Sequence, residues 1–249
     1  MRVDPIPCLR DNYAYVLHRA PDDAAAASPS EAWVVDPSEA TPVRAALEAA
    51  GLRLAGILLT HHHPDHVGGI ESLVDGADNP ALIVAGHARD RGRIPRMNVE
   101  LEAPSHAWVR APFDLLGLPV EARHIPGHTL AAIAWKIGDE VFTGDTLFAG
   151  GCGRLFEGTP AMMFDSLQSL CALPETTRLW FGHEYTAANL RFAASVEPDN
   201  AAVQARAATL PECTTPTTVA EERATNPFVR AADADELAAR RKLKDEWRG

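Results

Sequence analysis

The stretch THHHPDH at residues 60–66 decides the fold of this chain, because it concentrates potential metal ligands in the pattern HxHxDH. The apolar run 54–59 leads into it, as expected of a strand that ends in a functional loop. In an extended loop, residues spaced by two point the same way, so His61, His63 and Asp65 share one side. Two imidazoles can then serve one metal ion while Asp65 and His66 serve a neighbouring ion, and such a pair makes hydroxide available at neutral pH.

Three further donors lie elsewhere in the chain, each in a short motif that follows a predicted strand. His128 lies in PGHT at 126–129, Asp145 in TGDT at 143–146, and His183 in GHEYT at 182–186. A glycine directly precedes each donor, which permits close approach of the backbone. These residues are candidates to complete the ligand set.

Composition limits the class of protein. With 249 residues, 46% of them hydrophobic, the chain is long enough for one large domain, or a domain with a smaller module. Its net charge of -11 argues against nucleic acid and against an anionic membrane surface as partners. Four cysteines without paired spacing indicate free thiols in a reducing compartment, so a cytoplasmic location is expected.

Hydrophobic patterning predicts an α/β domain over residues 1–181 and a helical module over 182–249. In the first part, expected strands alternate with expected helices. The strands are 13–18, 32–36, 54–60, 81–85, 107–110, 120–124, 131–137, 141–143 and 178–181, and the helical segments are 41–50, 66–74 and 160–172. The second part is rich in alanine and is punctuated by prolines. Helices are expected there at 185–195, 200–210, 218–223 and 233–247.

The motifs HxHxDH, PGHT, TGDTLF and GHEYT, in this order, resemble those of the metallo-β-lactamase superfamily. The segment GCGRLFEGT at 151–159 and the basic run RKLKD at 241–245 narrow the resemblance to the glyoxalase II family, the hydroxyacylglutathione hydrolases. The resemblance implies a four-layer αββα sandwich followed by a small all-α C-terminal domain. It covers nearly the whole chain.

The resemblance also implies a site for two divalent metal ions, with zinc favoured and iron or manganese as alternatives. One ion would be held by His61, His63 and His128, and the other by Asp65, His66 and His183. Asp145 would bridge the two ions together with a hydroxide. Asp36 has two interpretations: a carboxylate behind the ligands that orients an imidazole, or a turn residue before Pro37.

The implied substrate contacts lie mostly near the C-terminus. Arg241 and Lys244 are three residues apart on one helical face, where the family holds the glycine carboxylate of glutathione. Their charges also suit the C-terminal end of a helix dipole. Tyr185 and Arg154 would contact the peptide portion of glutathione. Phe156 replaces a tyrosine found in some relatives, which removes a hydrogen bond worth about 1 kcal/mol.

The implied reaction is hydrolysis of S-(2-hydroxyacyl)glutathione, above all S-D-lactoylglutathione, to glutathione and D-lactate in methylglyoxal detoxification. Asp65 and Asp145, together with the bridging hydroxide, would be catalytic. A monomer is expected. Another hydrolase of the same superfamily, such as a lactonase or a different thioesterase, is the alternative. The remaining histidines are interpreted as surface or structural residues: His18, His62, His87, His106 and His124.

Overall fold

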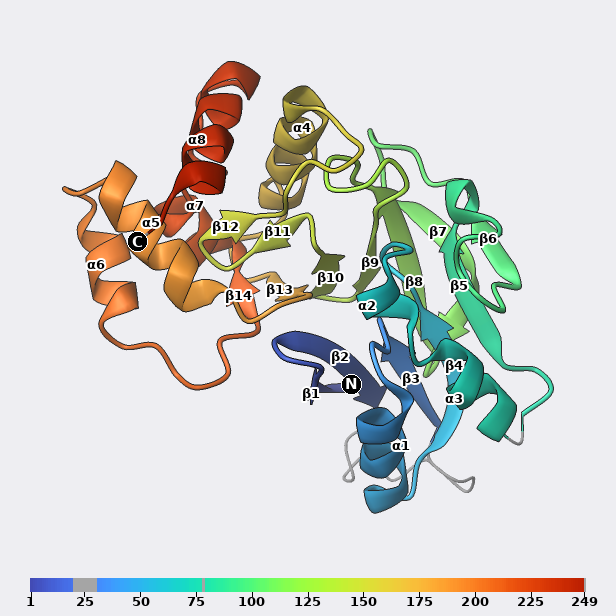
Figure 1. Cartoon of the computed structure of the whole chain (residues 1–249). Coiled ribbons are helices and arrows are strands. Elements are labelled where there is room, and N and C mark those ends of the chain that lie inside the picture. Colours follow the sequence, from blue (N-terminus) through green and yellow to red (C-terminus); the bar gives the residue numbers. More distant parts are fainter. Residues whose placement is uncertain (20–30, 78, 249) are drawn as a thin grey trace.

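The computed structural model describes residues 1–19, 31–77 and 79–248, and it contains two six-stranded sheets packed face to face (Figure 1). The first sheet has the order β1-β2-β3-β4-β5-β6. Its strands are β1 (Arg2–Cys8), β2 (Asn12–His18), β3 (Glu31–Val35), β4 (Arg53–Leu58), β5 (Ile83–His87) and β6 (Val99–Leu101). The strands from β3 to β6 run parallel, which places the loop of residues 60–66 at the carboxyl end of β4.

The second sheet has the order β14-β13-β10-β9-β8-β7. Its strands are β7 (Val109–Leu115), β8 (Leu118–His124), β9 (Ile133–Ile137), β10 (Glu140–Gly144), β13 (Arg178–Phe181) and β14 (Thr217–Thr218). A small ribbon of β11 (Leu147–Phe148) and β12 (Gly151–Cys152) follows β10. Since β10 and β13 are parallel, the residues that follow them meet at one edge of the sheet.

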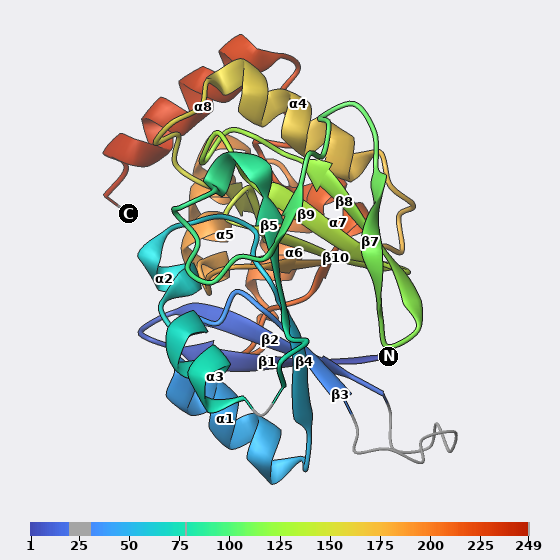
Figure 2. The same ribbon diagram turned by 90° about the vertical axis from the view of Figure 1, so that its right-hand side faces the viewer.

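Helices cover the outer faces of both sheets, which completes four layers (Figures 1 and 2). The first sheet carries α1 (Ala40–Ala49) and α3 (Ile70–Gly76), while α2 (Pro64–Val67) and the 3-10 turn η1 (Ala88–Asp90) lie in its loops. The second sheet carries α4 (Pro160–Cys171) and the C-terminal helices. These are α5 (Thr186–Val196), α6 (Ala201–Ala207), α7 (Val219–Thr225) and α8 (Ala234–Glu246). The predicted αββα sandwich with a helical C-terminal part is therefore confirmed.

Separate apolar clusters hold these layers together. Between the sheets, buried aromatic side chains such as Trp33, Trp135 and Phe142 form the central core. Outside the second sheet, Leu167 of α4 and Leu237 of α8 belong to one cluster with residues of β9 and β10. Burial of each such side chain contributes about 1.5–3 kcal/mol, so the C-terminal helices are firmly attached to the sheet.

The structure differs from the pattern expected from sequence in one predicted helix and in several short strands that were not predicted: β1, β6, β11, β12 and β14. The helical segment predicted at 66–74 is split into α2 and α3 at Gly68 and Gly69. A Cβ on Gly69 would lie 2.7 Å from the carbonyl oxygen of Pro37, so close packing requires glycine at the junction between the two helices. The strand β1 was not predicted because it contains Pro5 and Pro7, which an edge strand tolerates.

The C-terminal segment also contributes to the second sheet. The strand β14 pairs with Arg178 and Leu179 of β13, so two residues beyond position 182 extend that sheet. The boundary between 181 and 182 stays a prediction. Within residues 1–19, 31–77 and 79–248, no helix has the length and apolar character needed to cross a membrane.

Candidate metal centre and adjoining cavity

Three imidazoles converge where loops from the two sheets meet, and we call His61, His63 and His128 the trio cluster. The Nδ1 atom of His63 lies 3.1 Å from Nε2 of His61 and 3.0 Å from Nε2 of His128. Burial lowers the pKa of each of these histidines, most strongly that of His61. At neutral pH the imidazoles are therefore uncharged, with lone pairs available for a cation.

A second group, which we call the acid cluster, consists of Asp65, His66 and His183. The Oδ2 atom of Asp65 lies 3.3 Å from Nε2 of His183 and 3.9 Å from Nε2 of His66. Asp145 lies between the two clusters. One of its carboxylate oxygens is 3.3 Å from His66, and the other is 3.3 Å from His183 and 3.5 Å from His128.

The acid cluster is a network of opposite charges when no cation is bound. Burial by itself would lower the pKa of His183, but the charge of Asp145 and hydrogen bonds to Asp145 and Asp65 raise it to about 10. The pKa of His66 is likewise raised, against burial, by Asp145 and Asp36. The hydrogen bond from His183 lowers the pKa of Asp65, which stays ionised. A metal ion binding here would displace protons from the two imidazoles.

The ring nitrogens that face away from the centre have partners of their own. Nδ1 of His66 lies 2.9 Å from Asp36, and Nδ1 of His183 lies 2.8 Å from Asp11. Nδ1 of His128 lies 2.9 Å from the carbonyl oxygen of Arg154. These contacts orient each ring, so that Nε2 faces the centre.

Asp36 satisfies both of its sequence interpretations. It adopts a φ of 48°, as a turn residue does, and its carboxylate accepts hydrogen bonds from Thr60 while it contacts His66. Asp11 was missed as a partner because nothing in its local sequence points to His183. The contact arises from an isolated bridge between Asn12 and His183, which brings the turn after β1 to the loop after β13.

The two clusters fit a pair of divalent ions. Tetrahedral coordination at about 2.0–2.1 Å separates neighbouring ligand atoms by about 3.3 Å, close to the spacings within the trio cluster. The buried Nε2 atom of His66 and the buried Oδ1 atom of Asp145 lie 3.3 Å apart without forming a hydrogen bond. Both atoms can act as metal ligands, so a cation between them would satisfy both. The donors are nitrogen and carboxylate oxygen without thiolate, a set that suits zinc, iron or manganese.

Glycine permits the backbone to approach this tightly. A Cβ on Gly153 would lie 2.0 Å from the carbonyl oxygen of Asp145, and one on Gly182 would lie 2.3 Å from Oδ1 of Asp145. Both distances are far shorter than a van der Waals contact. The strand-end motifs therefore require glycine where it stands.

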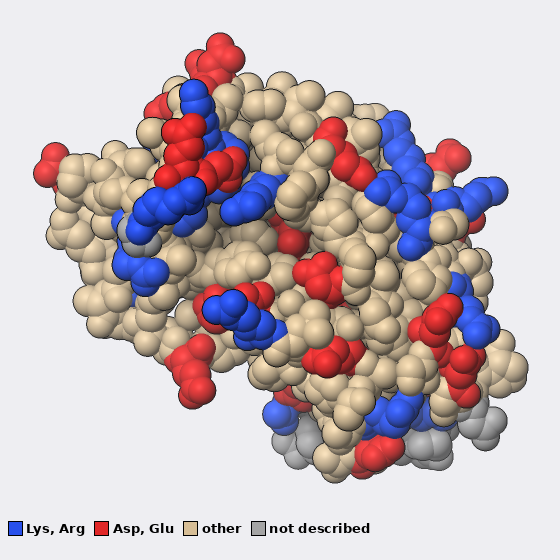
Figure 3. Space-filling model, viewed as in Figure 1, with Lys and Arg blue, Asp and Glu red and all other residues tan. Residues whose placement is uncertain are grey.

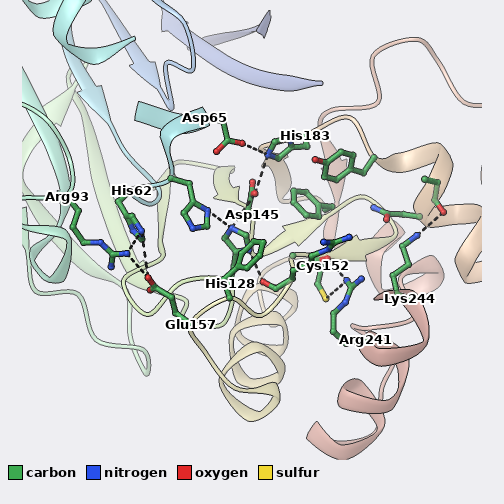
Figure 4. A pocket seen from close by; sticks show the side chains of 18 residues that line it. His62, Asp65, Arg93, His128, Asp145, Cys152, Glu157, His183, Arg241 and Lys244 are labelled. Carbon is green, nitrogen blue, oxygen red and sulfur yellow. Dashed lines mark hydrogen bonds and ion pairs between the residues drawn. The ribbon is translucent and has the colours of Figure 1, made fainter. Parts of the chain in front are cut away.

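A cavity of about 850 Å³ opens beside the clusters and extends to the C-terminal helices (Figure 4). That volume is in the range of about 300–1,000 Å³ found for small-molecule sites. His63, His128, Asp65, Asp145 and His183 line it, whereas His61 and His66 are buried behind them. On the molecular surface, Lys and Arg side chains gather on the side of the hollow formed by the C-terminal helices (Figure 3).

Arg241 and Lys244 of α8 line the far end of this cavity. Arg241 is buried, donates to the carbonyl oxygen of Cys152 at 2.9 Å, and pairs with Asp245 at 2.9 Å. The ammonium of Lys244 donates to the carbonyl oxygen of Ala188 and lies above two aromatic rings. Burial, together with the charge of Arg241, lowers the pKa of Lys244 to about 8, so most of its population is charged at neutral pH.

The other predicted substrate residues lie between the two ends. The ring of Tyr185 stacks on that of His183 with centroids 4.8 Å apart, and Tyr185 lines the cavity. Phe156 is 64% exposed, and its ring packs edge-on against His63 and His128. Arg154 is exposed, and its guanidinium lies 3.8 Å from Asp245. All of the predicted substrate residues therefore share one cavity with the clusters.

Several histidines that are not candidate metal ligands also have defined partners. His62, interpreted from sequence as a surface or structural residue, lines the cavity with its side chain only 11% exposed, and its Nδ1 atom lies 3.0 Å from Asp90. Burial and the nearby charge of Arg93 lower the pKa of His62 to about 4. His124 stacks on His87 with ring centroids 4.6 Å apart, a structural role consistent with its interpretation.

Comparison with known protein families gives two matches that together span most of the chain. Residues 26–183 match the metallo-beta-lactamase superfamily, and residues 184–247 match the hydroxyacylglutathione hydrolase C-terminus. The point where one match gives way to the other lies close to the predicted boundary.

Curated relatives that share one name align with this chain over most of their length. A hydroxyacylglutathione hydrolase of Synechococcus sp. (strain JA-2-3B'a(2-13)) is 47% identical, over 100% of this chain and 95% of the relative. The enzyme of the same name from Rhodobacter capsulatus is 44% identical, over 96% of this chain and 90% of the relative.

Solved structures share the fold. ETHE1 from Myxococcus xanthus has a TM-score of 0.68 at 25% identity, over 98% of this chain and 90% of the other. TTHA1623, crystallised in a di-iron-bound form, has a TM-score of 0.58 at 28% identity, over 92% of this chain and 100% of the other.

Proposed function

The chain belongs to the hydroxyacylglutathione hydrolase family of the metallo-β-lactamase superfamily, and on that premise we propose that it hydrolyses S-(2-hydroxyacyl)glutathione. S-D-lactoylglutathione is the foremost substrate, with glutathione and D-lactate as products. The enzyme would thereby act in methylglyoxal detoxification.

One observation carries this proposal: a single cavity joins a two-cluster metal centre to a pair of cationic side chains on α8. The centre suits attack on an acyl carbon. Arg241 and Lys244 suit a carboxylate some distance away, such as that of the glycine residue of glutathione. Arg241 and Lys244 also make structural contacts, with Cys152, Asp245 and Ala188, and their position in the same cavity as the clusters is what favours an anionic substrate.

The proposed cofactor is a pair of divalent ions, most simply zinc: the trio cluster and the acid cluster would each hold one, and Asp145, which lies between them, would supply its carboxylate. When bound, such ions supply Lewis acidity and lower the pKa of water toward neutrality. The same donor types accept iron or manganese.

The side chains around the ions have separate tasks in this mechanism. Tyr185, Arg241 and Lys244 hold the glutathione portion, so that the thioester carbonyl lies beside the clusters. Asp65 stays ionised, its side chain is 40% exposed, and it can orient water or accept a proton at its carboxylate. The leaving group is a thiolate with an ordinary pKa of about 8.5, so it needs little assistance from an acid.

We also propose that the enzyme is a cytoplasmic monomer. All four cysteines are free, as is typical of proteins in a reducing compartment. The cavity, both clusters and the cationic pair are all built from one chain, so a monomer suffices for the proposed activity.

The test is a steady-state assay of the zinc-loaded enzyme on lactoylglutathione, with the double variant Arg241→Ala/Lys244→Ala. Hydrogen bonds to charged groups contribute about 1.5–3 kcal/mol each, so we expect KM to rise by roughly 10-fold or more. The kcat should change less, because the clamp binds the ground state and the transition state alike.

The matched control is Lys242→Ala/Arg248→Ala, which removes the same charge from the end of the chain at exposed positions outside the cavity. Its KM should stay close to that of the wild type. No turnover of lactoylglutathione by the wild type, with hydrolysis of lactones or of other thioesters instead, would overturn the proposed substrate. An unchanged KM in the double variant would overturn the clamp alone.

A further inference from the structure

Four polar side chains on the side of the cavity away from α8 have no part in the mechanism above. They are His62, Asp90, Arg93 and Glu157, which we call the Glu157 network. Figure 4 shows three of them: His62, Arg93 and Glu157. His62, Arg93 and Glu157 line the cavity, whereas Asp90 is fully buried behind them. The nearest polar neighbours of Asp90 are His62, on the loop that carries His61 and His63, and Arg93, on its own segment, at 3.0 and 3.5 Å. Neither contact has hydrogen-bond geometry.

The network first engages the loop that follows β4. His62 stands between two members of the trio cluster in sequence, and its Nδ1 atom lies 3.0 Å from Asp90. The other ring nitrogen contacts the guanidinium of Arg93, which also lies 3.5 Å from Asp90. The segment that holds His61 and His63 is thereby attached to η1 and to the residues that follow it.

The network also engages the loop between β8 and β9. The carboxylate of Glu157 accepts a hydrogen bond of 2.6 Å from Arg93 and one of 2.8 Å from the backbone N–H of Leu130. The backbone N–H of Glu157 donates to the carbonyl oxygen of His128 at 3.3 Å. Glu157 therefore contacts the loop of His128 at two points while it holds Arg93.

These contacts matter because the trio cluster is assembled from two sheets. His61 and His63 follow a strand of the first sheet, and His128 follows a strand of the second. Packing between sheets allows small relative shifts, whereas three ligand atoms about 3 Å apart tolerate little displacement. A backbone hydrogen bond of 2.9 Å from Ile133 to Thr60 joins the two sheets near the site. The polar contacts through Arg93 and Glu157 add a link between the ligand loops themselves.

We propose that Glu157 is a positioning residue, which acts through Arg93, His62 and Leu130 to hold His128 against His61 and His63 in the geometry that a metal ion requires. This inference rests on the metal-binding part of the proposed function. It does not depend on the identity of the acyl substrate.

The test is the zinc affinity of Glu157→Gln, measured by competition with a chromophoric chelator. Gln keeps the size of the side chain and an acceptor for Leu130, but it loses the ion pair with Arg93. Loss of residues that orient metal ligands typically weakens binding by about 10–100-fold, and we expect roughly 10-fold for one of two zinc equivalents. The kcat on lactoylglutathione should fall while KM changes little.

The matched control is Glu100→Gln. Glu100 pairs with Arg91, and its side chain is 28% exposed against 24% for Glu157, but it lies on β6 outside the cavity. We expect wild-type zinc affinity from this variant. Similar melting of the metal-free proteins would show that Glu157→Gln folds normally.

A double-mutant cycle separates the two clusters. The loss caused by Glu157→Gln should vanish in a His128→Ala background and persist in a His183→Ala background. Persistence in both backgrounds would overturn the proposal, as would wild-type zinc affinity in the single variant.

A change in the preference between acyl groups at unchanged zinc affinity would instead make Glu157 a specificity residue, and would also overturn the proposal. If zinc binding behaves as expected but lactoylglutathione is not hydrolysed, the proposed substrate fails while the positioning role stands.

Discussion

Replacement of Asp36 by Asn is the sharpest available test of how the centre is held together. Asp36 is 2% exposed and accepts hydrogen bonds from the N–H and hydroxyl of Thr60 at 2.8 and 2.5 Å. Its Oδ2 atom lies 2.9 Å from Nδ1 of His66. Asn has the same shape and tolerates the φ of 48°, so the substitution changes hydrogen bonding with little change in backbone or packing.

The size of the effect follows from the number of hydrogen bonds that the Asn side chain can accept, because its amide has one acceptor oxygen where the carboxylate of Asp36 has two. If the amide oxygen of the Asn side chain accepts from the N–H of Thr60, its NH₂ group faces the Nδ1–H of buried His66. Two donors then face each other, and a charge-assisted hydrogen bond worth about 1.5–3 kcal/mol is lost. In a chain of this size, that loss lowers the Tm of the metal-free protein by roughly 3–12 °C. The alternative is that His66 moves its proton to Nε2, which then cannot bind a metal ion.

We therefore expect Asp36→Asn to weaken binding of one zinc equivalent by about 10–100-fold, which corresponds to about 1.4–2.8 kcal/mol. Chelator competition measures the affinity, and thermal unfolding in the presence of a chelator measures the stability of the metal-free protein. The control is Asp4→Asn, which breaks a similar contact of 2.7 Å with His18 far from the cavity. Wild-type affinity and stoichiometry in Asp36→Asn, in a protein that melts normally, would refute the orienting role.

Three other expectations follow from the site. Gly153→Ala should destabilise the fold by about 3 kcal/mol or more in denaturant unfolding, because the Cβ would lie 2.0 Å from the carbonyl oxygen of Asp145. The control Gly76→Ala should destabilise the fold only slightly, because its Cβ would meet the flexible end of an arginine at 3.3 Å. Equal destabilisation by the two variants would contradict the steric argument. Phe156→Tyr should lower KM for lactoylglutathione by about 5-fold through one added hydrogen bond worth about 1 kcal/mol, and an unchanged KM would place that ring away from the substrate. Zinc added at pH 7 should release protons from the acid cluster, because the pKa of His183, raised to about 10, lies above the pH; affinity there should rise with pH up to about 10. Calorimetry in two buffers of different ionisation enthalpy measures this release. If no protons are released, the imidazoles are already neutral before zinc binds, which would contradict the expectation.

Local sequence was sufficient for features set by neighbouring residues. The alternation in HxHxDH places His61, His63 and Asp65 on one side of a loop because backbone geometry alone determines it. The glycines at the strand ends predicted where the backbone approaches another group closely, but they did not predict which group. Strands and helices with regular apolar spacing lie near their predicted places. The break between α2 and α3 and the short or proline-containing strands β1, β6, β11, β12 and β14 were not predicted.

Contacts between distant segments required the tertiary structure. Asp11 lies beside His183, and Glu157 lies between the loops of His62 and His128, because separate strands end at the same edge of the sandwich. Nothing in the residues around these carboxylates encodes their partners.

The chain by itself therefore determined the ligand types, their order and the class of chemistry, since these depend on residue identity and short spacing. Only tertiary structure decided the distances within the ligand groups that the family resemblance implied, the contact of Asp11 with His183, and the cavity that Arg241 and Lys244 share with the clusters. The physical reason is that packing of two sheets and a helical layer sets distances between residues far apart in sequence, and local backbone preferences carry no information about those distances.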